Sequence, residues 1–410
     1  MLTPRQIELI KATVPVLRES GEALTSHFYK RMLNGNPELR NVFNNAHQAM
    51  GHQQKALAAA VLAYAENIEN PSVLAAAVNH IAHKHCSIGI RAEQYQIVGR
   101  HLLASIKEVL GDAATAELVD AWAAAYGQLA EILIGAENKI YEEQTGAAGG
   151  WSGWRPFQVA KIVDETPDAK SFYLKPADGG PISAYEPGQF ISVRTFIKSL
   201  GLVQPRQYTL SRAPSEDGQY RITVKRIDAK DQSPAGLMSQ HLHHEVKEGD
   251  ILELSAPAGV FYLDTQSLKP VMLMSAGIGI TPMIAMADHI MTKQAGREIY
   301  FFHVNRSREY IALRGDMHEI AHKYPHSHAA VFITRPNEDD KGHCCPFIHT
   351  SGRPTTAEVA DFAKAAIAAG ADAYICGPTS FMQDMQKALT DAGMAPEQIH
   401  SEFFGTGAAK

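Results

Sequence analysis

One histidine and one glutamate stand where helical patterns predict apolar residues. Apolar residues recur over 74–88 at the three-and-four spacing of a helical face, and His85 occupies one step of that stripe. A second stripe, over 122–140, contains Glu137. Because a carboxylate facing a core is rare unless a partner holds it, the sequence favours a His85–Glu137 pair. An imidazole oriented by a carboxylate is typical of a metal ligand, although a core histidine bonded to a neighbour is the simpler interpretation.

Three further polar side chains lie on apolar helical faces. Tyr95 begins one stripe, Gln53 shares a face with Leu57, and Tyr29 lies beside Phe28 in an early helix. Each alone is consistent with simple packing. Together they place a phenol and an amide beside a hydrophobic cavity, which is what a diatomic ligand on a metal requires, with the Tyr95 hydroxyl within reach of His85.

The segment 206–211, Arg-Gln-Tyr-Thr-Leu-Ser, follows one β-rich run and precedes another. A planar guanidinium such as that of Arg206 matches a phosphate bidentately. Gly236 then opens a short helix that includes Met238 and Ser239, and the amides at its start suit the second part of a pyrophosphate. An ordinary strand followed by a turn is the alternative for the segment taken alone.

Two glycine-containing runs each follow an apolar strand pattern. The first run consists of Gly277, Ile278, Gly279, Ile280, Thr281 and Pro282, and the second of Cys376, Gly377 and Pro378. Glycine permits close approach of the backbone to a pyrophosphate, and proline suits a first helical turn. Both runs sit at the carboxyl ends of predicted strands, where open α/β sheets bind ligands.

The composition limits which proteins these residues can belong to. The chain has 410 residues, of which 45% are hydrophobic and 20% charged, and this length suggests about two or three domains. With 38 Lys and Arg against 44 Asp and Glu, the net charge of -6 gives no basic footprint for nucleic acid or an anionic membrane. The absence of an apolar run long enough to span a membrane, the amphipathic N-terminus and the count of four cysteines predict a cytoplasmic protein.

Proline marks the predicted domain boundaries. Only four of the 21 prolines fall within residues 1–143, which predicts a helical first segment. Residues 144–150 are small and polar and predict a linker. Short β-rich runs over 151–265 predict an antiparallel barrel, and strands alternating with helical stretches over 266–410 predict an open parallel sheet.

Over its whole length the chain resembles the flavohaemoglobins. The resemblance rests on the helical segment with Phe43 after the Pro37 corner, on the flavin motif R-x-Y-[ST]-x-S of the ferredoxin-reductase family, and on G-x-G-x-T-P followed by C-G-P. It implies a multi-domain protein: an all-α globin (1–143), an antiparallel β-barrel FAD domain and an α/β parallel-sheet NAD(P)-binding domain. The implied cofactors are haem b, FAD, and NADH or NADPH.

The resemblance also implies roles for individual residues. His85 is the proximal ligand of the haem iron, Phe43 and Leu57 line the haem pocket, and the catalytic residues are Tyr29, Gln53, Tyr95 and Glu137. Lys84 and Glu402 would pair and tune the redox potentials. The FAD-binding residues would be Phe190, Arg206, Gln207, Tyr208, Thr209, Ser211, Gly236, Met238 and Ser239. The NAD(P)-binding residues would be those of the two glycine-containing runs together with Phe403, Phe404 and Gly405, with Phe404 covering the flavin and Cys376 near the nicotinamide.

The activity that the resemblance implies is nitric oxide dioxygenase. NAD(P)H would reduce FAD, FAD would pass single electrons to haem, and O2 bound at the haem would convert NO to nitrate. O2 and NO would be the substrates of a monomer with no nucleic acid, no transmembrane segment and no obligate protein partner. The alternatives are an NAD(P)H-dependent hydroperoxide or quinone reductase, a haem-based gas or lipid sensor, and a flavin reductase whose helical domain lacks haem.

Five conspicuous residues, two arginines and three histidines, lie outside these motifs. Arg306 and Arg308 follow a predicted strand and either hold a 2′-phosphate of NADP or are ordinary surface arginines. The cluster His241, His243 and His244 lacks a carboxylate or cysteine at metal-ligand spacing, and we interpret it as part of a solvated helix.

Overall fold

The computed structural model describes residues 2–43, 51–230, 234–336, 348–349 and 352–404. Contacts group the chain into two compact units, which are described separately. The first unit runs from the N-terminus to Trp154 and includes Ser192–Arg206, and the second comprises Arg155–Ile191 and the chain from Gln207 onward.

The first unit is helical. Its α-helices are α1 (Pro4–Ala12), α2 (Val14–Gly35), α4 (His52–Glu66), α5 (Ala75–Ile88), α6 (Ala92–Leu110) and α7 (Ala116–Gly146), with short 3-10 turns at Pro37–Asn41, Pro71–Leu74 and Gly111–Ala113. Thr3 and Thr115 begin α1 and α7 by accepting hydrogen bonds from backbone amides. Gly89 ends α5 in the left-handed conformation, with φ of 78°. Apolar side chains of α2, α4, α6 and α7, including Phe28 and Trp122, form the core.

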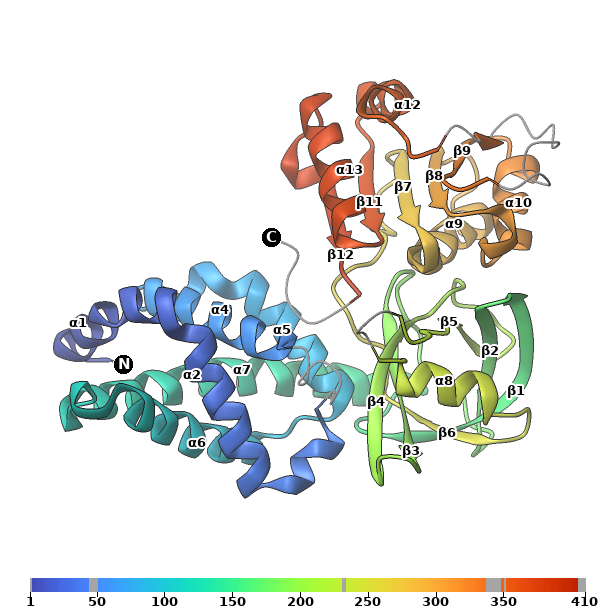
Figure 1. Ribbon diagram of the computed structural model, residues 1–410. Helices are drawn as coiled ribbons and strands as arrows, with labels where there is room; N and C mark the ends of the chain where they lie inside the picture. The colour runs from blue at the N-terminus through green and yellow to red at the C-terminus, as the bar shows by residue number, and fades with distance from the viewer. Residues whose placement is uncertain (1, 44–50, 231–233, 337–347, 350–351, 405–410) are drawn as a thin grey trace. The chain divides into compact units, whose positions relative to one another are not determined.

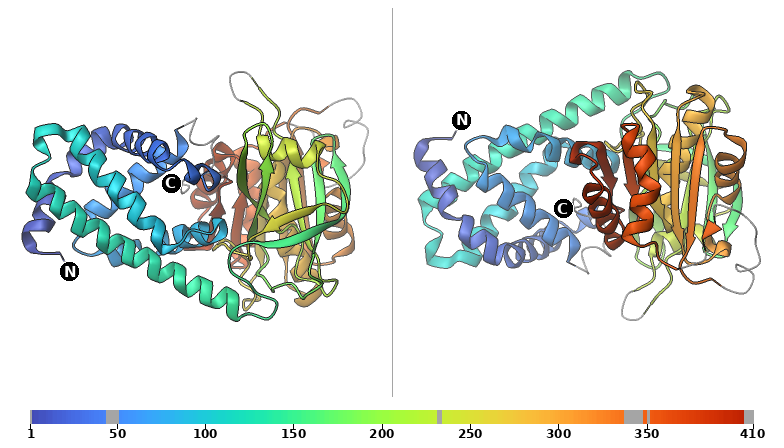
Figure 2. Two further views of the ribbon diagram at one scale, coloured as in Figure 1. Left: turned by 90° about the horizontal axis from the view of Figure 1, so that it is seen from below. Right: turned by 90° about the horizontal axis from the view of Figure 1, so that it is seen from above.

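Helix α7 is 31 residues long and is drawn in teal in Figure 2. It ends at Gly146, so the first residues of the predicted linker are helical. The boundaries of the linker and of the three domains stay predictions, because the contacts group Ser192–Arg206 of the antiparallel sheet with the helices and the rest of that sheet with the parallel sheet. No helix within the described ranges is both long and apolar enough to cross a membrane.

An antiparallel sheet follows the helical segment. Its strands are β1 (Arg155–Thr166), β2 (Ala169–Pro176), β3 (Phe190–Ile197), β4 (Leu202–Thr209), β5 (Tyr220–Lys225) and β6 (Ile251–Leu254), in the order β4-β3-β6-β1-β2-β5, with α8 (Leu237–His244) between β5 and β6. Strand β2 pairs antiparallel with both β1 and β5, with Phe172 opposite Ile162 and Ile222. These side chains are apolar, and Phe172 and Ile222 are fully buried, which fits a sheet that packs one face on a core.

A parallel sheet forms the last part of the chain. Its strands are β7 (Val271–Ala276), β8 (Ile299–Asn305), β9 (Ser327–Ile333), β10 (Ile348–His349), β11 (Asp372–Cys376) and β12 (Ile399–Glu402), in the order β10-β9-β8-β7-β11-β12. All residues of β7 and β8 are buried, which explains their nearly continuous apolar sequences.

Helices cover both faces of this sheet (Figure 1). They are α9 (Ile280–Lys293), α10 (Arg314–Lys323), α12 (Thr356–Ala368) and α13 (Thr379–Asp391). Side chains of α9 and α10 share one apolar cluster with the sheet, and those of α12 and α13 share another. The order of the strands reverses between β7 and β11, so the ends of these two strands form the switch point at which such sheets bind ligands. The predicted fold class, an all-α segment followed by an antiparallel and then a parallel sheet, is confirmed.

Candidate functional site

The structure brings His85, Glu137 and Tyr95 together from three helices. Nδ1 of His85, in the last turn of α5, lies 2.7 Å from Oε1 of Glu137 on α7 and 3.1 Å from the hydroxyl oxygen of Tyr95 on α6. The Tyr95 hydroxyl donates a hydrogen bond to the same carboxylate oxygen. Glu137 is only 2% exposed. The glutamate that the sequence placed on an apolar stripe is therefore a buried carboxylate whose two partners are His85 and Tyr95.

This geometry decides which nitrogen of His85 is left for a ligand. Because a carboxylate oxygen only accepts hydrogen bonds, the imidazole proton lies on Nδ1 and the lone pair on Nε2. Burial, together with the bond to Glu137, raises the pKa of Tyr95, so that the phenol stays protonated and donates at neutral pH. The three residues therefore fit a haem iron, which takes one proximal imidazole oriented by a carboxylate or carbonyl.

Two tyrosines of α7 that were not singled out in the sequence support this cluster. The Tyr126 hydroxyl donates to the carbonyl oxygen of Tyr95 at 2.7 Å, and the Tyr141 hydroxyl donates to that of Ile90 at 2.6 Å. Tyr126 approaches α6 closely at Gly99, where an added methyl would lie 2.5 Å from the tyrosine ring. Its position on an apolar stripe gave no sign of this role, because tyrosine is common in cores.

The residues predicted for the distal side come from α2, α4 and the turn after α2. The ring of Tyr29 is 9% exposed and lies edge-to-face with Phe43, 5.7 Å between centroids. Leu57 packs on the same apolar cluster, and Gln53 lies one turn before it on α4, half-buried. Burial raises the pKa of Tyr29, so its hydroxyl remains a hydrogen-bond donor. A buried phenol, an amide and apolar walls fit a pocket for a small apolar or weakly polar ligand.

The flavin motif lies at the end of strand β4. Thr209 is buried, Gln207 is exposed, and Arg206 donates a hydrogen bond from Nη1 to the carbonyl oxygen of Pro205 at 2.6 Å. Ser211 is fully buried, and its hydroxyl lies 2.8 Å from that of Thr223. The hydroxyl of Ser211 is thus engaged inside the protein.

The other predicted flavin contacts are built on close backbone approaches. Phe190 pairs with Ala258 across the sheet, and an added methyl on Gly259, whose φ is 116°, would lie 3.0 Å from the Phe190 ring. Gly236 precedes α8, and Ser239 in the first turn donates to its carbonyl oxygen at 2.9 Å. Met238 is buried. The start of α8 presents backbone amides that suit a pyrophosphate, with the Ser239 side chain holding the turn.

The two glycine-containing runs meet at the switch point of the parallel sheet. Residues Gly277–Gly279 form a 3-10 turn that leads into α9, with Pro282 in its first turn. An added methyl on Gly279 would lie 2.3 Å from the carbonyl oxygen of Cys376, so glycine alone allows the two loops to touch. Gly377 is also packed tightly, against Ala276. The amides at the start of α9 therefore fit the pyrophosphate of a dinucleotide.

Cys376 is fully buried, and burial raises the pKa of its thiol well above the ordinary value. A neutral buried thiol is inert as a nucleophile. Phe403 packs against the apolar cluster beneath α13, whereas Phe404 is 45% exposed. Of the two rings only Phe404 is free to cover a ligand, while Gly405 lies outside the described residues. Pairing between Lys84 and Glu402 stays a prediction, since the two residues belong to different units.

The structure corrects the interpretation of His243 and shows the partners of Arg306. His243 is 6% exposed and its Nε2 contacts the carbonyl oxygen of Val224 at 2.8 Å, so the solvated-helix interpretation is wrong for this residue. The imidazole of His243 thus joins α8 to β5, which the short sequence could not show. Arg306 contacts Oδ2 of Asp168 at 3.0 Å and stacks on the Tyr310 ring at 3.3 Å, so its guanidinium has partners within the protein.

Comparisons with known families match the three segments separately. The family described as Globin matches residues 26–133, the oxidoreductase FAD-binding domain matches residues 156–262, and the oxidoreductase NAD-binding domain matches residues 273–387.

Full-length relatives include proteins named Flavohemoprotein. The chain is 51% identical to the Flavohemoprotein of Bordetella pertussis and 49% identical to that of Chromobacterium violaceum, in each case over 407 residues and 99% of both chains. Among solved structures, the flavohemoglobin of Malassezia yamatoensis with bound FAD and heme is 30% identical, with a TM-score of 0.82 over 98% of this chain and 100% of that one. The FAD/NAD-binding domain of a nitric oxide dioxygenase from Vibrio cholerae is 31% identical, with a TM-score of 0.51 over 61% of this chain and 98% of that one.

Proposed function

Since the chain belongs to the flavohemoprotein family and carries globin, FAD-binding and NAD-binding domains, we propose that it is a nitric oxide dioxygenase that converts NO and O2 to nitrate with electrons from NAD(P)H. The related Vibrio cholerae domain belongs to a nitric oxide dioxygenase, which supports this reaction. Donor and acceptor sites lie on one chain, so we propose that it works without an electron-carrying partner protein.

The observation that carries the proposal is the contact of His85 with Glu137. When bound, FAD would take two electrons as hydride and release them singly, and haem would bind O2 and accept those electrons one at a time. The carboxylate keeps the His85 proton on Nδ1 and makes the imidazole a stronger donor through Nε2. A strong proximal donor favours reaction of oxygen over its storage, because it pushes electron density toward the iron.

On the distal side, the chain would hold and orient the substrates. Tyr29 stays protonated in its buried position and donates a hydrogen bond to a small oxygen-containing ligand. Phe43 and Leu57 supply apolar walls that exclude water and admit NO and O2, both nearly apolar gases. Gln53 offers an amide on the same helix as Leu57.

The experiment that tests this function uses the full chain loaded with haem and FAD. With NADH, NO and air together, we expect nitrate to form in a one-to-one ratio with NO. Tyr29→Phe should slow NO consumption at least about tenfold, since a buried hydrogen bond to the reacting group is lost. Tyr64→Phe is the matched control, because this buried tyrosine on α4 bonds instead to the carbonyl oxygen of Ala125. Nitrate at background levels would reject the proposal.

A hydroperoxide reductase is the second candidate, because the same His85–Glu137 contact suits O–O bond activation. Turnover with an organic hydroperoxide under anaerobic conditions, at a rate above that with NO and air, would favour this alternative. Turnover of NO and O2 without turnover of the hydroperoxide would favour the dioxygenase.

A further inference from the structure

A buried arginine joins the flavin motif to the nicotinamide-binding part of the second unit. Arg221 on β5 is 6% exposed, and its guanidinium meets the carboxylate of Asp316, in the first turn of α10, at 3.0 and 3.3 Å. The same guanidinium donates to the carbonyl oxygen of Ser211 and, from Nε, to the Ser211 hydroxyl at 3.2 Å. One side chain therefore holds the last residue of the flavin motif and the first turn of α10.

A second connection returns from Ser211 to the start of α10. The hydroxyls of Ser211, Thr223 and Ser171 follow one another at 2.8 and 2.9 Å, and Ser171 donates to Glu165 at 2.6 Å. The other oxygen of the Glu165 carboxylate accepts the backbone N–H of Leu313 at 3.1 Å. Leu313 directly precedes α10, so the contacts close into a ring that we call the flavin–α10 ring.

The direction of every hydroxyl in this ring follows from its two ends. A guanidinium only donates and an ionised carboxylate only accepts. Ser171 therefore donates to Glu165 and accepts from Thr223, Thr223 accepts from Ser211, and Ser211 accepts from Nε of Arg221. The Ser211 hydroxyl also lies 3.2 Å from the carbonyl oxygen of Arg221, a longer contact than the 2.8 Å to Thr223. Ser211, Thr223 and Ser171 are at most 4% exposed. A buried chain whose members each have both a donor and an acceptor is rigid, because breaking any link leaves a buried polar group unpaired.

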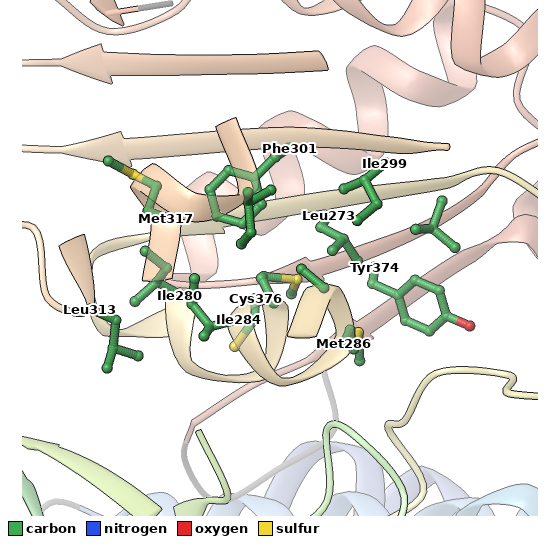
Figure 3. Packing of buried hydrophobic residues seen from close by; sticks show 14 of the residues in the cluster. Leu273, Ile280, Ile284, Met286, Ile299, Phe301, Leu313, Met317, Tyr374 and Cys376 are labelled. Carbon is green, nitrogen blue, oxygen red and sulfur yellow. The ribbon is translucent and has the colours of Figure 1, made fainter. Parts of the chain in front are cut away.

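The part of the flavin–α10 ring that lies at Leu313 is also held firmly. Among the described residues other than glycine, Leu313 alone has positive φ, at 54°, a strained conformation for such a side chain. Its side chain is fully buried in the cluster that contains Ile280 of the glycine-containing run and Met317 (Figure 3). A further contact comes from α9, where Asp288 accepts the backbone N–H of Ala213, two residues after the flavin motif, at 2.9 Å.

We propose that Arg221 and Asp316 are positioning residues for hydride transfer, and that the flavin–α10 ring holds the flavin motif in register with the nicotinamide-binding loop. Both residues would act through Ser211 and α10, without contact to either cofactor. Hydride transfer depends steeply on the distance between donor and acceptor, and a displacement of about 1 Å can cost on the order of a hundredfold in rate. A rigid, largely buried link between the two binding segments suits that demand.

The test uses the full chain with both cofactors and the variant Asp316→Asn. The amide keeps the shape but loses the charge-assisted, bidentate contact with Arg221. In anaerobic stopped-flow measurements, we expect the limiting rate of flavin reduction at saturating NADH to fall about tenfold, with the apparent Kd for NADH changed less than twofold. Glu319→Gln is the matched control, since this exposed carboxylate of α10 pairs only with Lys323 at 2.8 Å in a surface contact.

Two further readouts separate positioning from folding and from the proposed dioxygenase activity. Hydrogen exchange should become faster at 209–213 and 311–316 in Asp316→Asn but not in Glu319→Gln. Photochemical reduction of the flavin should reduce the haem at the wild-type rate in both variants, because that step does not use NADH. If Asp316→Asn loses FAD, Thr223→Val breaks the same ring without removing a charge, and we expect about a threefold slower flavin reduction.

A limiting rate within twofold of wild type in both ring variants would overturn the proposal. So would a rate loss that appears only as weaker NADH binding, because positioning acts after the nicotinamide has bound. The combination Arg221→Lys with Asp316→Asn should be no slower than the slower single variant, since both act through one contact. Additive losses would also contradict the ring.

Discussion

The two units each bury a pair formed by a carboxylate and a basic side chain, but with opposite exposure. In the helical unit the Glu137 side chain is 2% exposed and the His85 side chain is 32% exposed. In the second unit the Arg221 side chain is 8% exposed and the Asp316 side chain is 35% exposed. The first arrangement leaves one edge of the imidazole accessible, whereas the second engages all three guanidinium nitrogens of Arg221 in contacts within the protein. A buried contact between a carboxylate and a basic side chain can therefore either leave a ring nitrogen accessible or hold two segments in place.

Removing one partner at a time from the Arg221–Asp316 pair tests which of its two charges is buried. Asp316→Ala leaves a buried guanidinium that cannot lose its proton, and we expect a loss of about 3 kcal/mol in the free energy of unfolding. Arg221→Met leaves a carboxylate that water can reach, and we expect about half that loss. Flavin fluorescence on FAD release reports on this unit, while the three tryptophans, Trp122, Trp151 and Trp154, all report on the first.

Equal losses for the two variants, or a loss seen mainly in tryptophan fluorescence, would contradict the assignment of the buried charge to Arg221.

The second prediction concerns the His85–Glu137 pair. Glu137→Gln should weaken haem binding about 10- to 100-fold, because groups that orient a metal-binding histidine contribute on that order to affinity. The rate of haem transfer to apomyoglobin measures this loss. Glu131→Gln, an exposed position on the same helix, is the control and should release haem at the wild-type rate. Unchanged haem release in Glu137→Gln would mean that the carboxylate serves packing alone.

The pair in the helical unit could be predicted from the sequence, and the pair in the second unit could not. A helix shows each of its faces at a fixed spacing, so His85 and Glu137 stood out as polar residues within apolar stripes. Arg221 lies in a strand whose first five residues are all buried, and Asp316 lies in the polar first turn of a helix, where acidic residues are common. Neither position breaks a pattern, and 95 residues separate them.

The glycine-containing runs were also predictable, because only backbone chemistry was needed. Gly279 could be expected to allow a close approach, and the structure shows that Cys376 is the neighbour it approaches. The role of Ser211 was not predictable in the same way. Its hydroxyl has the same chemistry whether it faces a cofactor or Thr223, and only the packing of β5 against the motif decides between them.

His303 is a buried histidine without a charged partner among the described residues, and it shows what burial alone does to the pKa of an imidazole. Its Nδ1 lies 2.9 Å from the Ser275 hydroxyl, a neutral group in place of the carboxylate that His85 meets, and burial lowers its pKa from 6.5 to about 3. The unfolded chain therefore binds a proton below about pH 6.5 that the folded chain does not bind. Stability contributed by this group is complete above that pH and is lost as the pH falls toward 3.

Between about pH 6.5 and 5, His303→Gln should reduce the slope of unfolding free energy against pH by up to about 1.4 kcal/mol per unit, the value for one proton. Urea titrations followed by flavin fluorescence measure this slope. His318→Gln, on the surface of α10, should leave it unchanged. A slope that is the same in His303→Gln and in the wild type would show that His303 charges freely in the folded protein.

The smallest expected change in stability comes from Tyr126, which holds Tyr95, and through it the His85–Glu137 contact, by a neutral hydrogen bond. Tyr126→Phe removes only the contact from its hydroxyl to the carbonyl oxygen of Tyr95 at 2.7 Å, and a neutral bond of this kind contributes about 1 kcal/mol. We expect that loss in the tryptophan-monitored transition and none in FAD release. Haem transfer should accelerate less than in Glu137→Gln, since Tyr126 acts on the backbone of Tyr95 and not on the imidazole. A haem loss as large as that of Glu137→Gln would mean that the position of α6, more than the carboxylate, orients His85.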